Sequence, residues 1–146
     1  MSYSISALVM LAAGLGIPVL ASLNATLGQF IGSPVAAVTV LLFVAFFSLC
    51  IILVFTVQFP VAKLAEAPRH LFLAGLFVVF YMLSITAIAP SFGVGNAIFF
   101  VLLGQLISAA VIDHFALFGS TGSPLTLTRT LGVGVMGLGV WLTQHA

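Results

Sequence analysis

Long apolar runs separated by short polar links form the main pattern of this chain. Five runs are predicted to be helices, at about residues 5–27, 35–57, 71–89, 95–115 and 125–143. Each has close to the length of about 20 residues that a helix needs to cross the hydrocarbon core of a bilayer. The pattern predicts an all-α membrane protein, in which a bundle of five transmembrane helices forms a single domain over residues 1–146.

The polar links carry helix start and stop signals. Two of them end in Ser-Pro, at Ser33–Pro34 and Ser123–Pro124, which is the pairing expected of an N-cap followed by a first-turn proline. After the third run, Pro90 and Gly93 are predicted to close a tight turn into the fourth. These signals support the division into five helices.

Composition points to the same environment. Hydrophobic residues make up 63% of the chain and charged residues 3%, with a mean hydropathy of +1.42. Soluble domains carry roughly 25% charged residues, so this chain has too few to cover a water-exposed surface. Its net charge of +1 is not gathered into a patch, so no nucleic acid partner is expected. Cys50 is the only cysteine, and no metal or other cofactor is expected either.

The basic residues predict an orientation. With five spans, Lys63, Arg69 and Arg129 all fall in or beside links on one side of the bilayer, together with the amino terminus. Links rich in Lys and Arg stay on the cytoplasmic side. The amino terminus is therefore predicted to be cytoplasmic and the carboxyl terminus exterior.

The fourth run contains the most informative polar residue, Gln105. An unpaired amide in hydrocarbon costs roughly 4–8 kcal/mol on the water-to-cyclohexane reference. Gln105 must therefore face a solute pathway or a hydrogen-bonding partner on another helix. Gly104 and Ser108, four residues apart, share a small face on which a second helix can approach closely.

At the end of this run stand Asp113 and His114. One interpretation is that both are simply solvated in the headgroup region. The other starts from the helix dipoles, because Asp113 at a carboxyl end and Arg129 near an amino end both oppose the dipole of their helix. Under this interpretation the two charges approach each other, and the group of three serves gating or coupling.

Two further polar residues lie inside predicted spans. Asn24 follows Pro18 in the first run, either on a solute pathway or near the exterior interface. Tyr81 lies near the middle of the third run, where an aromatic residue more often packs than lines a pathway. Both are candidates for the substrate pathway, together with Gln105 and Ser108.

Small residues predict helix packing. Ala7, Gly14, Ala21 and Gly28 recur every seven residues and give the first helix one small face. In the last run a G-x-G-x-x-G match begins at Gly132, but the chain leaves no room for the βαβ unit that a dinucleotide site requires. Gly132 and Gly139 share a helix face and are assigned to packing. No catalytic constellation is present, so the chain is not expected to be an enzyme.

Two blocks of the sequence carry a family resemblance. I-P-V-L-A-S-L-N-A-T-L at residues 17–27 and G-S-P-V-A-A at 32–37 resemble the opening of the YdcZ-type family of the drug/metabolite transporter superfamily. G-Q-L-I-S-A-A-V-I-D-H-F-A-L-F at 104–118, then R-T-L-G-V-G-V at 129–135, resemble its closing half. Ala116 stands where the family has a glycine, and Leu20 stands where it has a glutamine.

The resemblance implies a half-size exporter unit of about five spans in the bacterial inner membrane. It also implies that two such units, identical or homologous, assemble in opposite orientations around a small-molecule substrate. The small helix faces and the thin five-helix bundle favour the same antiparallel dimer. The alternative is a non-transporting membrane subunit, in which the polar residues serve only helix–helix packing.

Overall fold

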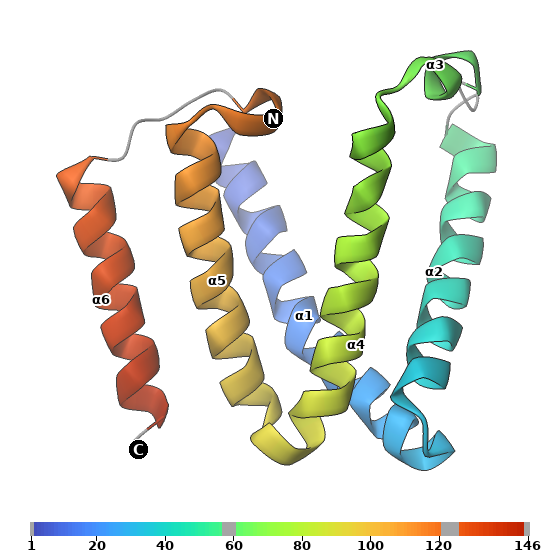
Figure 1. Ribbon diagram of the computed structural model, residues 1–146, viewed down its shortest axis with the longest axis horizontal. Coiled ribbons are helices and arrows are strands. Elements are labelled where there is room, and N and C mark those ends of the chain that lie inside the picture. Colours follow the sequence, from blue (N-terminus) through green and yellow to red (C-terminus); the bar gives the residue numbers. More distant parts are fainter. Residues whose placement is uncertain (1, 57–60, 121–125, 145–146) are drawn as a thin grey trace. The chain divides into compact units, whose positions relative to one another are not determined.

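Helices account for all regular secondary structure in residues 2–56, 61–120 and 126–144, which are the residues that the computed structural model describes. The all-α class is thus confirmed for these ranges (Figure 1). In chain order the elements are α1 (Tyr3–Ile31), α2 (Pro34–Thr56), α3 (Val61–Glu66), the 3₁₀ turn η1 (Arg69–Leu73), α4 (Ala74–Phe92), α5 (Val94–His114), the 3₁₀ turn η2 (Leu117–Gly119) and α6 (Leu127–Gln144).

Four membrane-crossing candidates lie within the described residues. They are α1, α2, the continuous segment Arg69–Phe92 and α5, each long and apolar enough to span a bilayer. The predicted fifth span corresponds to α6, which has 18 residues and so a length of about 27 Å. It carries Arg129 in its first turn and Gln144 at its end. It is not among the four helices that are long and apolar enough to be membrane-crossing candidates. The fifth crossing therefore stays a prediction.

The first link is shorter than the sequence predicts. Instead of ending near residue 27, α1 continues to Ile31 and stops at Gly32, whose φ of 74° is left-handed. The N–H of Gly32 donates to the Gln29 carbonyl at 3.2 Å, which closes the helix end. Ser33 then caps α2, because its Oγ accepts from the Ala36 N–H at 3.2 Å, and Pro34 is the first residue of α2. The predicted Ser-Pro start is confirmed here.

The turn after the third run is also tighter than predicted. Pro90 does not end the helix, since α4 includes it and runs on to Phe92. Pro90 has no N–H to donate to the carbonyl four residues earlier, so α4 lacks one backbone hydrogen bond in its last turn but is not ended by the proline. Gly93, with φ of 92°, alone makes the break, and its N–H donates to the Ala89 carbonyl at 2.9 Å.

The last helix begins with a different cap. Thr126 Oγ1 accepts from the Arg129 N–H at 3.3 Å and so caps α6, whose first residue is Leu127. The predicted cap at Ser123–Pro124 lies outside the described residues.

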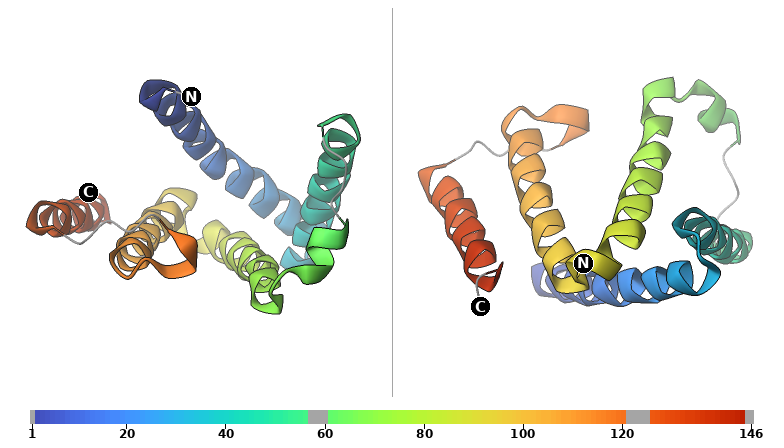
Figure 2. Two further views of the ribbon diagram at one scale, coloured as in Figure 1. Left: turned by 90° about the horizontal axis from the view of Figure 1, so that it is seen from above. Right: turned by 60° about the horizontal axis from the view of Figure 1, so that its bottom comes forward.

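The chain divides into two compact units, residues 1–94 and 95–146. In the first unit α1 packs against both α2 and α4, and α2 also touches α4. The buried residues of α1 all lie in its second half, from Ala21 to Gly28, while its amino-terminal half extends away from α2 and α4 (Figure 2). The second unit contains α5 and α6. That the chain works as one transmembrane domain stays a prediction.

Candidate functional site

The first unit is built around a buried polar contact that crosses two helices. Asn24 of α1 donates from Nδ2 to Oγ1 of Thr86 in α4 at 2.6 Å. The two residues retain only 4% and 1% of their accessible surface. A short hydrogen bond without competing water joins helices effectively in an apolar medium. The amide of Asn24 therefore has a partner inside the protein, which is the packing interpretation of this residue.

Gly28, one turn further along α1, allows three helices to meet. A Cβ atom added there would lie 3.2 Å from Thr86 Cγ2, 3.5 Å from Pro34 Cα and 3.7 Å from Ala37 Cβ. The predicted small face of α1 is thus used in its second half, where Ala21 is fully buried. In its first half Gly14 is exposed, and no atom lies within 4 Å of its Cβ position.

Asn24 also borders a groove on the first unit. This groove, of about 330 Å³, lies between α1 and α2, and apart from Asn24 it is lined by apolar side chains: Leu20, Leu23, Leu27, Val40, Leu41 and Val44. The aliphatic side chains of this lining cannot form hydrogen bonds with a solute. The one polar group of the lining, the amide of Asn24, already donates to Thr86.

Tyr81 of α4 is a further polar residue of the first unit. Its hydroxyl oxygen is buried and finds no hydrogen-bond partner among the described residues. The sequence identified Tyr81 but missed Thr86. A threonine inside an apolar helix commonly bonds its own backbone, so its position gave no sign of an interhelical bond.

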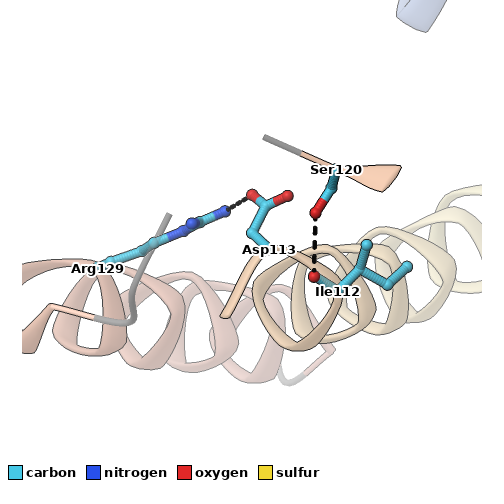
Figure 3. A network of polar contacts seen from close by, with 4 residues as sticks. All are labelled: Ile112, Asp113, Ser120 and Arg129. Carbon is cyan, nitrogen blue, oxygen red and sulfur yellow. Dashed lines mark hydrogen bonds and ion pairs between the residues drawn. The ribbon is translucent and has the colours of Figure 1, made fainter. Parts of the chain in front are cut away.

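In the second unit an ion pair joins α5 and α6. Arg129 Nη2 donates to Asp113 Oδ2 at 2.6 Å, with both side chains about one third exposed (Figure 3). The predicted approach of these two residues is confirmed. Each charge opposes the dipole of its own helix, so each supplies the counter-charge that the other lacks. Ion pairs with this degree of exposure contribute about 0–1 kcal/mol to stability.

The loop after α5 folds back beside the ion pair. Ser120 Oγ donates to the Ile112 carbonyl at 3.3 Å, and Figure 3 shows this bond next to Asp113, the residue that follows Ile112 in α5. Ala116 and Phe118 in the loop have left-handed φ values of 49° and 54°. His114 is exposed, and its ring meets Phe115 edge to face, with centroids 4.8 Å apart.

A second polar contact joins the opposite ends of the same two helices. Gln144 Nε2 donates to Asn96 Oδ1 at 3.1 Å. Asn96 lies in the first turn of α5, and Gln144 is the last residue of α6. The sequence did not single out either residue, because polar side chains at helix ends are ordinary. The only available signal was register: an antiparallel pair that joins Asp113 to Arg129 also brings Asn96 close to Gln144.

Between these two contacts lies an apolar groove. Leu103 reaches across, with Cδ1 at 3.7 Å from the position of a Cβ on Gly137. A groove of about 180 Å³ remains, lined by Phe99, Leu102, Leu103, Leu106, Met136, Gly139, Val140 and Thr143.

Gln105, Gly104 and Ser108 are exposed on α5. No described residue forms a hydrogen bond with the side chain of Gln105 or Ser108, and no atom lies within 4 Å of a Cβ position on Gly104. In α6, Gly132 is equally open, whereas Gly139 borders the groove. Among the described residues no cluster of three or more His, Cys, Asp or Glu side chains could hold a metal ion.

No curated protein and no solved structure matches the chain. Residues 5–142 match the family described as "Putative inner membrane exporter, YdcZ". This match covers almost the whole chain, including both units, and agrees with the apolar helices. The protein therefore belongs to the YdcZ family of multi-pass inner-membrane proteins.

Proposed function

We propose that the protein exports a small solute as an inverted dimer, with the solute pathway passing Gln105 at the helix interface. The observation that carries this proposal is the unpartnered amide of Gln105. It lies at the middle of α5, a helix of 21 residues, and so near the bilayer midplane. An amide left there without a partner costs several kcal/mol, about 4–8 on the alkane reference, so we expect a polar cavity on this face.

Uncovered small residues support the second half of the proposal. Gly14, Gly104 and Gly132 each leave an open helix face, although small residues in membrane helices serve close contact with another helix. An inverted mate would cover such faces and give the pseudo-two-fold symmetry from which many transporters are built. The substrate pathway then includes Gln105 and Ser108, with Tyr81 and Asn24 as weaker candidates.

The distribution of charged residues suggests which chain is the dimer partner and which residues form the gate. Because Lys63, Arg69 and Arg129 are predicted on one face, each chain should insert mainly with its amino terminus in the cytoplasm. The inverted mate is then a homologous chain or, failing that, an inverted copy. At the cytoplasmic end the Asp113–Arg129 pair, with His114 beside it, serves as the gate or coupling group.

The alternative function, a non-transporting subunit, has one observation in its favour. The Asn24–Thr86 hydrogen bond joins α1 to α4, which supports a packing role for a polar side chain inside an apolar helix. Gln105 could in the same way form a hydrogen bond that joins α5 to a helix of a partner protein. The two functions differ in what Gln105 contacts, and this difference can be tested.

The test replaces the amide with an apolar side chain of similar size. In liposomes, Gln105→Leu should abolish transport, or ligand-induced thermal stabilisation found in a solute screen, while the protein remains folded. Ile107→Leu, an equally exposed position of α5, is the matched control and should transport normally. If Gln105→Leu instead dissociates the assembly and leaves residual transport, the packing function is correct.

The orientation is tested separately in cells. A Cys50→Ala background removes the only cysteine, after which Ser2→Cys or Ala146→Cys is labelled with an impermeant thiol reagent. Labelling at residue 146 alone supports a fixed orientation, and comparable labelling at both sites supports dual insertion. A purified protein that transports as a monomer, or only as a parallel dimer, would contradict the inverted dimer.

A further inference from the structure

We propose that the groove between α1 and α2 binds a small neutral amphiphile, a molecule with an aliphatic body and one hydrogen-bond donor that Asn24 Oδ1 accepts. All residues of this site lie within residues 1–94. The proposal concerns binding, and it goes beyond the proposed function, whose pathway passes Gln105. The following features of the groove carry it.

The carboxamide of Asn24 is only partly used inside the protein. Its Nδ2 donates to Thr86 Oγ1 at 2.6 Å, but a carboxamide also has a carbonyl oxygen that accepts hydrogen bonds. No described residue donates to Asn24 Oδ1. An acceptor without a partner is costly in an apolar medium. This oxygen is therefore a site for a donor that the helices themselves do not supply.

The carbonyl oxygen of Asn24 is not sealed inside the helix packing. Among the described residues, the hydroxyl of Tyr81 is the one fully buried side-chain polar atom that lacks a partner, so the unpaired Oδ1 of Asn24 remains accessible. Asn24 as a whole is 4% exposed, and its side chain is the polar member of the groove lining. The acceptor therefore opens into the groove between α1 and α2.

The rest of the lining selects an aliphatic and uncharged ligand. The groove has a volume of about 330 Å³, near the lower end of the range of about 300–1,000 Å³ for small-molecule sites. With no charged group in the lining, a charged ligand would lose its hydration without gaining a counter-charge. A pure hydrocarbon would leave Asn24 Oδ1 unpaired. A neutral molecule with one donor satisfies both the aliphatic walls and the acceptor.

The helix packing fixes the position of this acceptor. The hydrogen bond from Nδ2 to Thr86 sets the orientation of the Asn24 carboxamide. One turn further along α1, the close approach at Gly28 holds α1 against α2 and α4. The acceptor is thus ordered before a ligand binds, which favours affinity. Asn24 is the group that touches the ligand, and Thr86 is a positioning residue.

The experiment labels the full-length protein in lipid nanodiscs with an aliphatic alcohol that carries a photoactivatable diazirine in its chain. After illumination, the adducts are located by peptide mass spectrometry. They are expected on lining residues of both helices, such as Leu20, Leu23 and Val44. Labelling spread evenly over the exposed apolar residues, with no enrichment in the groove, would overturn the proposal.

A competition between matched molecules tests the hydrogen bond. Hexanol and methyl pentyl ether are isomers, but only hexanol has a donor. At equal concentration in the membrane, hexanol should prevent groove labelling about tenfold more effectively than the ether, the change expected from one hydrogen bond. Hexylammonium, which is charged, should not compete. Equal competition by hexanol and the ether would mean that the groove holds only hydrocarbon, such as a lipid acyl chain, and the proposal would be wrong.

Variants of the polar pair test the stated contact. Asn24→Ala should make hexanol and the ether compete equally, because the acceptor is lost. Thr86→Val should weaken the preference for hexanol, because the carboxamide of Asn24 is then free to rotate. A change in this preference is not expected from destabilisation alone. If Asn24→Ala retains the tenfold preference, Asn24 does not contact the ligand.

A variant that fills the groove leaves the polar pair intact. Val44→Trp lies on the exposed wall of the groove and should remove the groove adducts. Val54→Trp, exposed on α2 outside the groove, is the matched control and should be labelled like the parent protein. If Val44→Trp retains the adducts of the parent protein, the groove is not the site.

Failure of this inference and failure of the proposed function give different results. Labelling and competition are measured without transport, whereas the proposed function is tested at Gln105. If the parent protein shows the hexanol preference but transports no solute, the binding site stands and the transport function falls. If it transports a solute but shows no hexanol preference, the transporter stands and this binding site falls.

Discussion

The two units join their helices in opposite ways. In residues 1–94, helices meet at their small residues, with Gly28 against Thr86 and Ala37 and with a buried bond from Asn24 to Thr86. In residues 95–146, by contrast, the contacts between α5 and α6 include two polar ones near the helix ends. There, polar side chains join the helix ends, and an apolar groove separates them.

This difference follows from the solvent. In lipid, apolar side chains gain nothing by leaving the solvent, so helices associate through close packing and hydrogen bonds. The first unit uses both at one buried point. The second places its bonds near helix ends, where water is within reach and an ion pair need not be fully desolvated. Its central residues are left open, and these include Gln105. Under the proposed function, the first unit is a scaffold and the second provides the surface for a ligand or partner.

The largest expected effect lies at the point of closest packing. Gly28→Leu should destabilise the first unit by about 3 kcal/mol, because even a Cβ atom at this site lies 3.2 Å from Thr86 Cγ2. The measurement is unfolding of purified protein by heat or by graded detergent denaturation. Gly14→Leu is the matched control, since no atom lies within 4 Å of its Cβ position. Equal losses in both variants would contradict the contrast between the two halves of α1.

The buried hydrogen bond of the first unit should give the next largest effect. Asn24→Ala and Thr86→Val should each destabilise the protein, with a coupling energy of about 1–2 kcal/mol in a double-mutant cycle. Thr39→Val serves as control, because the Thr39 hydroxyl donates to the Val35 carbonyl of its own helix. A coupling energy near zero would mean that the bond at 2.6 Å does not hold α1 to α4.

These two sites show what the sequence could and could not predict. Hydropathy sufficed for the four long apolar helices and their approximate ends, since each of these is determined by local composition. The short helix α3, in contrast, lies in a stretch that was predicted as a polar link. The seven-residue spacing identified Gly14 and Gly28 alike, yet only Gly28 is packed, because neighbouring helices and not spacing decide which glycine is covered. For the same reason the partner of Asn24 could not be named, as it lies 62 residues away.

In the second unit, one of the two polar contacts between α5 and α6 could be predicted from the sequence, and the other could not. Asp113 and Arg129 could be paired from sequence because a charge that opposes its helix dipole needs a counter-charge. Asn96 and Gln144 carry no charge, so nothing marked them as a pair. The groove between the helices could not be predicted at all, since it depends on the spacing that the end contacts impose.

A smaller effect, and a stabilising one, is expected in the loop after α5. Ala116 has φ of 49° and ψ of 40°, a left-handed conformation that costs an L-residue with a Cβ about 1–2 kcal/mol. Ala116→Gly should therefore raise the stability by about 1 kcal/mol. Ala109→Gly, inside α5, should lower it by a similar amount. A loss of stability on Ala116→Gly would contradict the left-handed conformation of this loop.

The smallest effect on stability is expected at the ion pair, where the effect on transport should be large. Asp113→Asn should cost only about 0–1 kcal/mol, because both side chains are about one third exposed. Part of this cost should disappear at high salt, which screens exposed charges. Arg129→Gln tests the other partner, and the double variant should be no less stable than either single one. If the pair is a gate, each neutral variant should change the transport rate in liposomes far more than the unfolding midpoint. A loss of several kcal/mol would show instead that the pair is buried in the assembled protein, and an unchanged transport rate would remove its role as a gate.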